Sequence, residues 1–176
     1  MRKVVYGGAM SLDGYIAGPN GEHDWIVMDP DIDFAAMTSR FNTFLIGRKT
    51  FEVMRGMGTA GPAVSGISSF VFSRTLRAGD CPGATLSDDA EEVVGALRTQ
   101  QGKDIALFGG GELFRSLLDA GLVDGIEMAL VPVLLGGGIP LLASPAARAR
   151  LTLRGHRVYE KTGTVSLEYG IEQPRS

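Results

Sequence analysis

The chain has 176 residues, 44% of them hydrophobic and 21% charged, with a formal net charge of −3. This composition is ordinary for a globular protein with a hydrophobic core, and the length predicts one domain over residues 1–176. The slight negative charge gives no reason to expect nucleic acid as a partner. The single cysteine, Cys81, excludes an internal disulfide and has no ligand cluster beside it, so no metal is expected. No apolar run reaches the roughly 18 residues of a membrane span, and the N-terminal run is too short for a signal peptide, so we expect a cytoplasmic protein.

The first third of the chain predicts two strands and two helices. Residues 3–10 (KVVYGGAM) form a buried strand that ends near Ser11, and residues 11–25 (SLDGYIAGPNGEHDW) form a long ordered loop, in which Asp13 belongs to an Asp-Gly turn. Residues 31–41 (DIDFAAMTSRF) predict a helix, because Phe34, Met37 and Phe41 share one face, with Asp31 at its cap or in its first turn. A buried strand, NTFLIG, and a short helix, RKTFEVMR, then follow each other directly.

The rest of the chain continues the alternation. SFVFSR predicts a third strand, and residues 87–102 (SDDAEEVVGALRTQQG) predict a helix with Ser87 as its N-cap. DIALF predicts a fourth strand and GELFRSLLDAG a helix. Residues 124–142 predict a long strand with a glycine-rich loop after it, and the alternation around KTGT in residues 149–172 predicts an antiparallel hairpin. Together these elements predict an α/β fold with a mostly parallel central sheet, helices on both faces and the C-terminal antiparallel hairpin at one edge.

Three consecutive glycines, Gly109, Gly110 and Gly111, join the fourth strand to its helix. One interpretation is a tight strand-to-helix turn. The other is a cradle for a phosphate, because a helix start offers free N–H groups and the positive end of the helix dipole. The dinucleotide fingerprint G-x-G-x-x-G is not met, since Phe114 stands at its third glycine, and both interpretations stay open.

Cations and hydroxyl groups follow two other strands. Gly47 is succeeded by Arg48, Lys49 and Thr50, and the strand FVF is succeeded by Ser73, Arg74 and Thr75. Ligands of open α/β sheets bind at the carboxyl edge, where strand ends of this kind meet. A ligand with two separate phosphate groups accounts for all three strand ends, and NADPH, with its pyrophosphate and 2′-phosphate, is such a ligand.

The segments AMSLDGYIAG, FLIGRKTFE, VFSR, LFGGGELFRSLL and LVPVLLGGGIPLL occur in this order over most of the chain. In them the chain resembles the dihydrofolate-reductase-like superfamily, and specifically the reductase domain of bifunctional riboflavin-biosynthesis deaminase-reductases (the RibD C-terminal type). The resemblance implies a dihydrofolate reductase-like three-layer sandwich, NADPH as hydride donor and a homodimer. It also implies cofactor contacts at Ala9, Ile16, Gly47, Arg48, Lys49, Thr50, Ser73, Arg74, Gly109, Gly110, Gly111, Glu112 and Leu113.

The substrate side of the resemblance rests on fewer residues. By analogy with the acid that grips the pterin ring in dihydrofolate reductases, Asp31 is the candidate catalytic residue, with Asp33 as a competitor, and Trp25 and Phe34 are candidate substrate contacts. Ala129 stands where dihydrofolate reductases commonly present a hydroxyl, and LLGGGIPLL has the deaminase-reductase form; both argue against dihydrofolate. The chain lacks the zinc-deaminase patterns, so it resembles a stand-alone reductase domain.

These observations predict an NADPH-dependent reductase that transfers a hydride to a small nitrogen heterocycle. The substrate is of the pyrimidine or pterin type, with 5-amino-6-(5-phosphoribosylamino)uracil of riboflavin biosynthesis as one example. Two alternatives remain at this stage: a non-catalytic nucleotide-binding protein that kept the fold, and a Rossmann-type carbonyl reductase.

Overall fold

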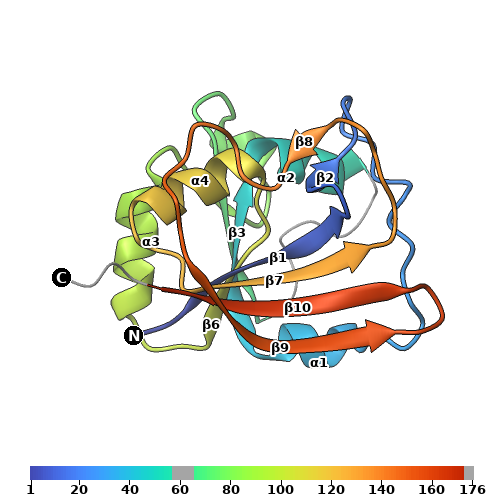
Figure 1. The fold of residues 1–176 in the computed structure, drawn as a ribbon. Coiled ribbons are helices and arrows are strands. Elements are labelled where there is room, and N and C mark those ends of the chain that lie inside the picture. Colours follow the sequence, from blue (N-terminus) through green and yellow to red (C-terminus); the bar gives the residue numbers. More distant parts are fainter. Residues whose placement is uncertain (57–65, 173–176) are drawn as a thin grey trace.

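The computed structural model describes residues 1–56 and 66–172. Within them, one eight-stranded sheet has the strand order β5-β4-β3-β6-β1-β7-β10-β9 (Figure 1). Its strands are β1 Val4–Ser11, β3 Phe41–Gly47, β4 Ser68–Phe72, β5 Thr85–Ser87, β6 Asp104–Leu107, β7 Gly125–Val131, β9 Leu151–Tyr159 and β10 Thr164–Ile171. The helices are α1 Phe34–Ser39, α2 Arg48–Gly56, α3 Ala90–Thr99 and α4 Gly111–Asp119, with a 3-10 turn at Ala78–Asp80.

The sheet is parallel from β5 to β7 and antiparallel at its C-terminal edge. Parallel pairing links β5 to β4, β4 to β3, β3 to β6, β6 to β1 and β1 to β7. The last hairpin then adds β10 antiparallel to β7, and β9 antiparallel to β10. This arrangement confirms the predicted mostly parallel sheet with a C-terminal antiparallel hairpin.

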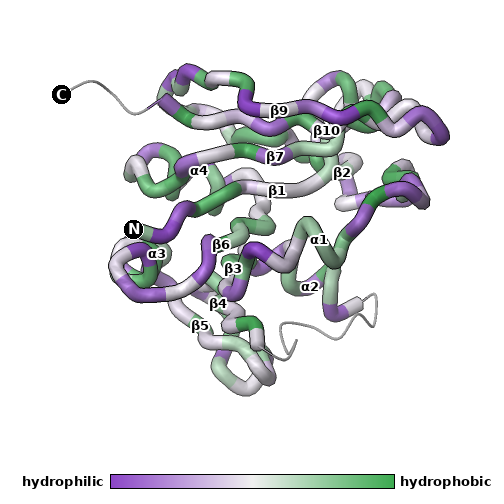
Figure 2. The backbone as a smooth tube through the Cα atoms, turned by 90° about the horizontal axis from the view of Figure 1, so that it is seen from below, coloured by the Kyte–Doolittle hydropathy of each residue, from purple (hydrophilic) through white to green (hydrophobic). Residues whose placement is uncertain are grey.

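Helices cover both faces of the sheet because neighbouring residues of a strand point to opposite sides. On β3, Leu45 packs in a cluster with side chains of α3 and α4, whereas Ile46 packs with Phe51 of α2. Figure 2 shows α3 and α4 on one side of the strands and α1 and α2 on the other. The molecule is therefore the predicted three-layer sandwich of the dihydrofolate reductase type. The Rossmann-type alternative is wrong, because its strand order, 3-2-1-4-5-6, differs from this one.

A small second sheet stands over the carboxyl end of β1. It consists of β2, Tyr15–Ala17, and β8, Ile139–Pro140, which pair antiparallel. The sequence predicted both segments as loops. Each strand is too short to show a hydrophobic period, and the two lie more than a hundred residues apart, so their pairing has no local signal.

Two helix starts differ from the sequence prediction. Helix α1 begins at Phe34 and is capped by Asp33, whose carboxylate accepts from Ala36 N, so Asp31 lies outside the helix and Phe41 belongs to β3. Its apolar side chains also stay in solvent, with Phe34 46% and Met37 47% exposed. Helix α3 is capped by Asp89 rather than Ser87, because Ser87 is the last residue of β5 and its carbonyl accepts from Ser73 N.

Among the helices of the described residues, none combines the length and apolar character needed to cross a membrane.

Candidate functional site

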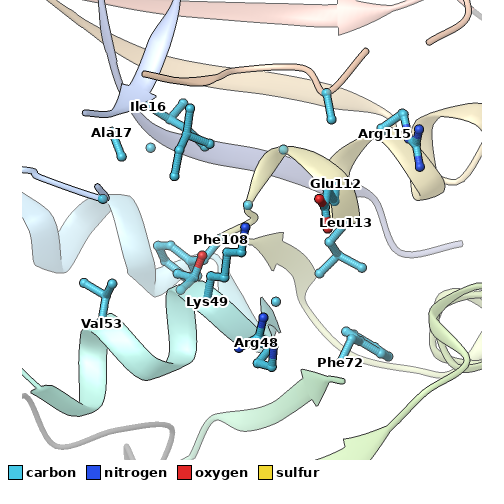
Figure 3. Close-up of a pocket in the computed structure, with 18 of the residues that line it drawn as sticks. Ile16, Ala17, Arg48, Lys49, Val53, Phe72, Phe108, Glu112, Leu113 and Arg115 are labelled. Carbon is cyan, nitrogen blue, oxygen red and sulfur yellow. The ribbon is translucent and has the colours of Figure 1, made fainter. Parts of the chain in front are cut away.

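A large cleft opens at the carboxyl ends of β1, β3, β4 and β6, beneath the β2–β8 sheet (Figure 3). It encloses about 1740 Å³, well above the roughly 300–1,000 Å³ of a site for one drug-sized molecule. The cleft has room for a dinucleotide and a second small ligand. The predicted cofactor residues that line it are Ala9, Ile16, Gly47, Arg48, Lys49, Thr50, Ser73, Arg74, Gly110, Gly111, Glu112 and Leu113.

The three strand ends singled out in the sequence are direct neighbours in space. β3 pairs in parallel with β4 on one side and with β6 on the other. Because parallel strands end at the same edge of a sheet, residues 48–50, 73–75 and 109–111 form one continuous rim. We call this the phosphate rim, after the ligand groups whose chemistry it suits: it combines helix starts, hydroxyl groups and cations.

Gly109 and Gly111, the first and last residues of the glycine triplet, pack against ring and backbone atoms that leave no space for a side chain. Gly47 N donates to Gly109 O at 2.7 Å, and a Cβ on Gly109 would lie 2.8 Å from the ring of Tyr6. A Cβ on Gly111 would lie 2.8 Å from Pro140 O. Gly109 itself is buried and has a φ of +79°, which only glycine adopts without strain. The tight-turn interpretation is therefore a structural fact.

Helix α4 starts at this turn with its first amides open to the cleft. Gly110 is its N-cap and offers no capping side chain, and the first intrahelical bond runs from Phe114 N to Gly110 O. The N–H groups of Gly111, Glu112 and Leu113 precede that bond, and all three residues line the cleft. Such a helix start attracts an anion, because free N–H groups and the helix dipole act together.

The cations of the rim differ in their surroundings. Arg48 pairs with Glu52 at 2.9 Å, one turn along α2. Within the described residues, neither Lys49 nor Arg74 has a hydrogen-bond or ion-pair partner. Ser73 orients its strand end, because its Oγ accepts from Thr75 N and Leu76 N. As far as the described residues show, the rim thus presents two positive charges without a partner and one that is partly neutralised.

The opposite end of the cleft is apolar. Ile16 and Ala17 of β2 lie across from Val53 of α2, with Phe108 at the end of β6 between the two walls (Figure 3). Phe108 packs edge-on against Phe44, with ring centroids 4.8 Å apart. Tyr6 lies below the glycine turn, stacked on Phe114, and burial raises the pKa of its hydroxyl well above the usual range.

The three candidate substrate residues are not among those that line this cleft. Asp31 is 52% exposed and pairs with Lys161 in the β9–β10 turn at 2.7 Å. Trp25 donates from Nε1 to Glu22 O at 3.1 Å within its own loop, and Phe34 is exposed at the start of α1. The roles inferred for these residues from the family resemblance remain predictions.

Asp29 is a structural residue that the sequence interpretation missed. Asp29 is only 2% exposed. Its carboxylate accepts hydrogen bonds from Thr162 N at 3.1 Å, from Thr162 Oγ1 at 2.9 Å and from Asp31 N at 2.9 Å. Burial acts to raise the pKa of Asp29, but these hydrogen bonds and the nearby Lys161 charge outweigh it, so the pKa lies below its ordinary value. The loop before α1 is thereby fastened to the C-terminal hairpin.

Asp13 was interpreted as a local turn residue, but its main contacts are distant in sequence. Its carboxylate accepts from Leu135 N at 3.1 Å and Gly136 N at 2.8 Å, as well as from Ser11 Oγ at 2.7 Å. The Ser11 hydroxyl, together with the two N–H groups, holds the pKa of Asp13 below its ordinary value. The two segments that carry β2 and β8 are held together at this point.

In the described part of the chain, no group of three or more His, Cys, Asp or Glu side chains is placed to hold a metal ion. The site is thus an extended cleft on a dihydrofolate reductase-like sheet. Cations and amides gather at one end, where the acidic Glu52 and Glu112 also line the cleft, and apolar side chains line the other end.

The fold and cleft place the protein in the dihydrofolate reductase-like class. More specifically, the chain belongs to the RibD C-terminal domain family, whose model matches residues 2–165. It is 34% identical to the uncharacterized protein YyaP of Bacillus subtilis (strain 168), with 96% of this chain and 94% of YyaP covered.

Two solved structures show the same fold. One is a protein from Shewanella sp. PV-4 with a proposed place in riboflavin biosynthesis. Its sequence is 24% identical to this chain, its structure superposes with a TM-score of 0.82, and the match covers 97% of this chain and 99% of the Shewanella chain. The other is dihydrofolate reductase from Enterococcus faecalis complexed with NADP(H) and RAB-propyl, which is 17% identical with a TM-score of 0.70, over 97% of each chain.

Proposed function

We propose that this protein is a single-domain NADPH-dependent reductase that acts on a small nitrogen heterocycle of the pyrimidine or pterin type. The observation that carries the proposal is the phosphate rim: three neighbouring parallel strands end in cations, hydroxyl groups and free amides on one edge of the cleft. The Enterococcus reductase of the same fold, complexed with NADP(H), supports the choice of cofactor.

The residues present fit NADPH in three parts. The pyrophosphate suits the start of α4, where Gly110 leaves open space beside Thr50 and the N–H groups of Gly111, Glu112 and Leu113 precede the first intrahelical bond. The 2′-phosphate suits Arg74, which has no hydrogen-bond or ion-pair partner among the described residues, with Arg48 and Lys49 on the neighbouring strand end. The nicotinamide suits the apolar end, against Ala9 of β1 and Ile16 of β2.

When bound, NADPH supplies the hydride. The chain itself would bind and orient the cofactor and exclude water. The phosphate rim would anchor the cofactor, and the β2–β8 sheet covers the end of the cleft where the nicotinamide ring and the substrate would meet. The proposed catalytic role of Asp31 requires that its carboxylate leave Lys161 and enter the cleft.

Calorimetry with NADPH and NADH tests the cofactor assignment. We expect NADPH to bind more tightly, and we expect Arg74→Ala to raise the Kd for NADPH by about ten-fold or more, since a hydrogen bond to a charged group contributes about 1.5–3 kcal/mol. The Kd for NADH should change little. Arg150→Ala is the matched control, because Arg150 is exposed and its backbone carbonyl accepts from Glu172 N, a bond that the substitution keeps. Failure to bind either cofactor, or a preference for NADH, would refute the assignment.

Oxidation of NADPH at 340 nm against pterins, pyrimidines and quinones tests catalysis. We expect turnover with at least one planar heterocycle. NADPH binding without any turnover would instead favour a non-catalytic nucleotide-binding protein with this fold.

We also propose a homodimer, formed through the outer edge of the sheet. β9 is one of the two edge strands of the sheet and carries three exposed apolar side chains, Leu151, Leu153 and Val158, exposed by 43%, 51% and 57%. Such an edge favours association. Light scattering should give twice the chain mass and should give the single-chain mass for Leu153→Lys; a monomeric parent protein would contradict the proposal.

A further inference from the structure

Charge is unevenly distributed along the cleft. Figure 3 shows Arg48, Glu112 and Arg115 toward one end and Ile16, Ala17 and Val53 toward the other, with Lys49 and Phe108 between them. Arg74 follows β4, which lies further from β1 in the strand order than β3 does. Among the described residues that line the cleft, the lysine and arginine side chains are these four: Arg48, Lys49, Arg74 and Arg115.

The apolar end is defined by Ile16, Ala17, Val53 and Phe108, and among the described lysines and arginines that line the cleft Lys49 lies beside Phe108, at the boundary with the charged end (Figure 3). Two of these side chains are well exposed for apolar groups, with Val53 39% and Phe108 36% exposed. Residues 57–65, which lie outside the described ranges, read MGTAGPAVS and contain no lysine or arginine.

Phe108 is held in a fixed orientation. Its ring meets the Phe44 ring at an interplanar angle of 76°, and its backbone N–H donates to Leu45 O at 2.9 Å. An aromatic side chain that is rigid, partly exposed and in a cleft suits contact with another ring, by stacking or edge-to-face packing.

We propose that the substrate is a neutral planar ring compound without a phosphate group, bound against Phe108, Val53 and Ile16. This inference rests on the proposed function, since it assigns the cofactor to the charged end. With NADPH bound there, Lys49 and the arginines face cofactor phosphates. A sugar-phosphate substituent at the apolar end would then lose water without gaining a positive partner, which is costly for a charged group.

Riboflavin and riboflavin 5′-phosphate form a suitable pair of probes, because they share one planar ring system and differ by a single phosphate. Quenching of flavin fluorescence gives the Kd of each, with NADP⁺ present at saturation so that the rim cations are occupied. We expect riboflavin to bind, and its phosphate ester to bind no more tightly. A Kd for the ester about ten-fold lower, which is the gain of one charge-assisted hydrogen bond, would overturn the proposal. Absence of riboflavin binding would overturn it as well.

Substitutions at Val53 and Phe108 test whether the flavin ring binds at the apolar end of the cleft. Val53→Arg places a cation at the apolar end and should shift the preference toward the phosphate ester by about ten-fold. Phe108→Ala should weaken both flavins by a similar factor, because both lose the same ring contact. Gln100→Arg is the control, since Gln100 is the exposed C-cap of α3 and does not line the cleft. A Phe108→Ala protein that keeps its flavin affinity while circular dichroism shows a native fold would overturn the placement.

Failure of this inference differs from failure of the proposed function. If NADP⁺ binds and the phosphate ester is preferred, the substrate class is wrong and the cofactor assignment stands. If NADP⁺ does not bind, the cofactor assignment falls, whereas riboflavin binding that is lost in Phe108→Ala still supports a neutral-ring site.

Discussion

Oδ2 of Asp13 accepts a hydrogen bond from the N–H of Gly136 at 2.8 Å, between residues 123 positions apart. The bond joins the turn after β1 to the loop before β8, and two neighbouring bonds strengthen the junction, from Leu12 N to Val133 O and from Leu141 N to Gly14 O. The β2–β8 sheet, which forms one wall of the cleft, is built from the two segments that Asp13 connects.

Asp13→Asn should weaken the hydrogen bonds that hold the β2–β8 sheet in place and should leave the structure of the phosphate rim unchanged. An amide side chain presents an NH₂ group where the carboxylate accepted hydrogen bonds, so it matches the Leu135 and Gly136 N–H groups less well. We expect turnover of the proposed reaction to fall by about ten-fold or more, because small misplacements of reacting groups are costly, while the Kd for NADPH changes little. Hydrogen exchange should rise in residues 11–17 and 133–141.

Asp24→Asn is the matched control for Asp13, because Asp24 is exposed in the loop that follows β2. Equal effects of the two substitutions, or an unchanged exchange rate in both segments of the Asp13 variant, would contradict a positioning role for Asp13.

Gly111→Ala should weaken cofactor binding and lower the melting temperature. The added Cβ would lie 2.8 Å from Pro140 O and 3.2 Å from Leu141 O, so the start of α4 has to move away from the β8 segment. Gly95→Ala in α3 is an informative control, because its Cβ would meet nothing within 4 Å. That change should stabilise the protein by about 0.5–1 kcal/mol through the helix propensity of alanine. Thermal unfolding with and without NADPH measures both, and a Gly111→Ala protein as stable as the parent would show that the close approach is unimportant.

Asp29→Asn should destabilise the protein at neutral pH, with an effect that fades in acid. The pKa of Asp29 is below its ordinary value in the folded protein, so the ionised carboxylate stabilises the fold above the unfolded-state pKa. That contribution is lost as the pH falls through the lower folded-state pKa. We therefore expect the difference in unfolding free energy between parent and variant to be largest near pH 7 and to shrink below about pH 4. Urea unfolding at several pH values measures it; a difference that does not depend on pH would contradict this explanation.

Asp31→Asn and Lys161→Met form a pair that tests the catalytic prediction for Asp31. The two side chains form an exposed ion pair, and such pairs contribute little to stability. If Asp31 only tethers the loop, both substitutions should change turnover by less than about two-fold, and this result would contradict its proposed catalytic role. A large loss of turnover in Asp31→Asn with none in Lys161→Met would instead establish Asp31 as an acid in the reaction.

The phosphate rim was predictable because its signals are local. Each of its three parts is a short run in which a β-rich apolar segment is followed at once by polar or glycine residues, as in LIGRKT and ALFGGG. The order of strands in the sheet was not needed to see that each part is a strand end. Parallel pairing of β3 with β4 and β6 then brings the parts to one edge.

Helix starts were less predictable because several capping residues compete. In SDDAEE, both Ser87 and Asp89 can cap, and the choice is made by the pairing of β5 with β4, which holds Ser87 in a strand. Similarly, the apolar face of residues 31–41 predicted a longer helix, whereas Phe41 belongs to β3 and Phe34 is exposed at the start of α1.

By itself, the sequence determined the α/β class, the mostly parallel sheet, the closing hairpin and the residues of the phosphate rim, because hydrophobic period and turn chemistry act over a few residues. Only the tertiary structure decided that Asp13 holds Gly136, that Asp29 holds Thr162, that Asp31 pairs with Lys161 and that β2 pairs with β8. Each of these contacts joins residues more than a hundred positions apart. The sequence of a short segment cannot predict such a distant partner, because the packing of the whole chain determines which residues come into contact.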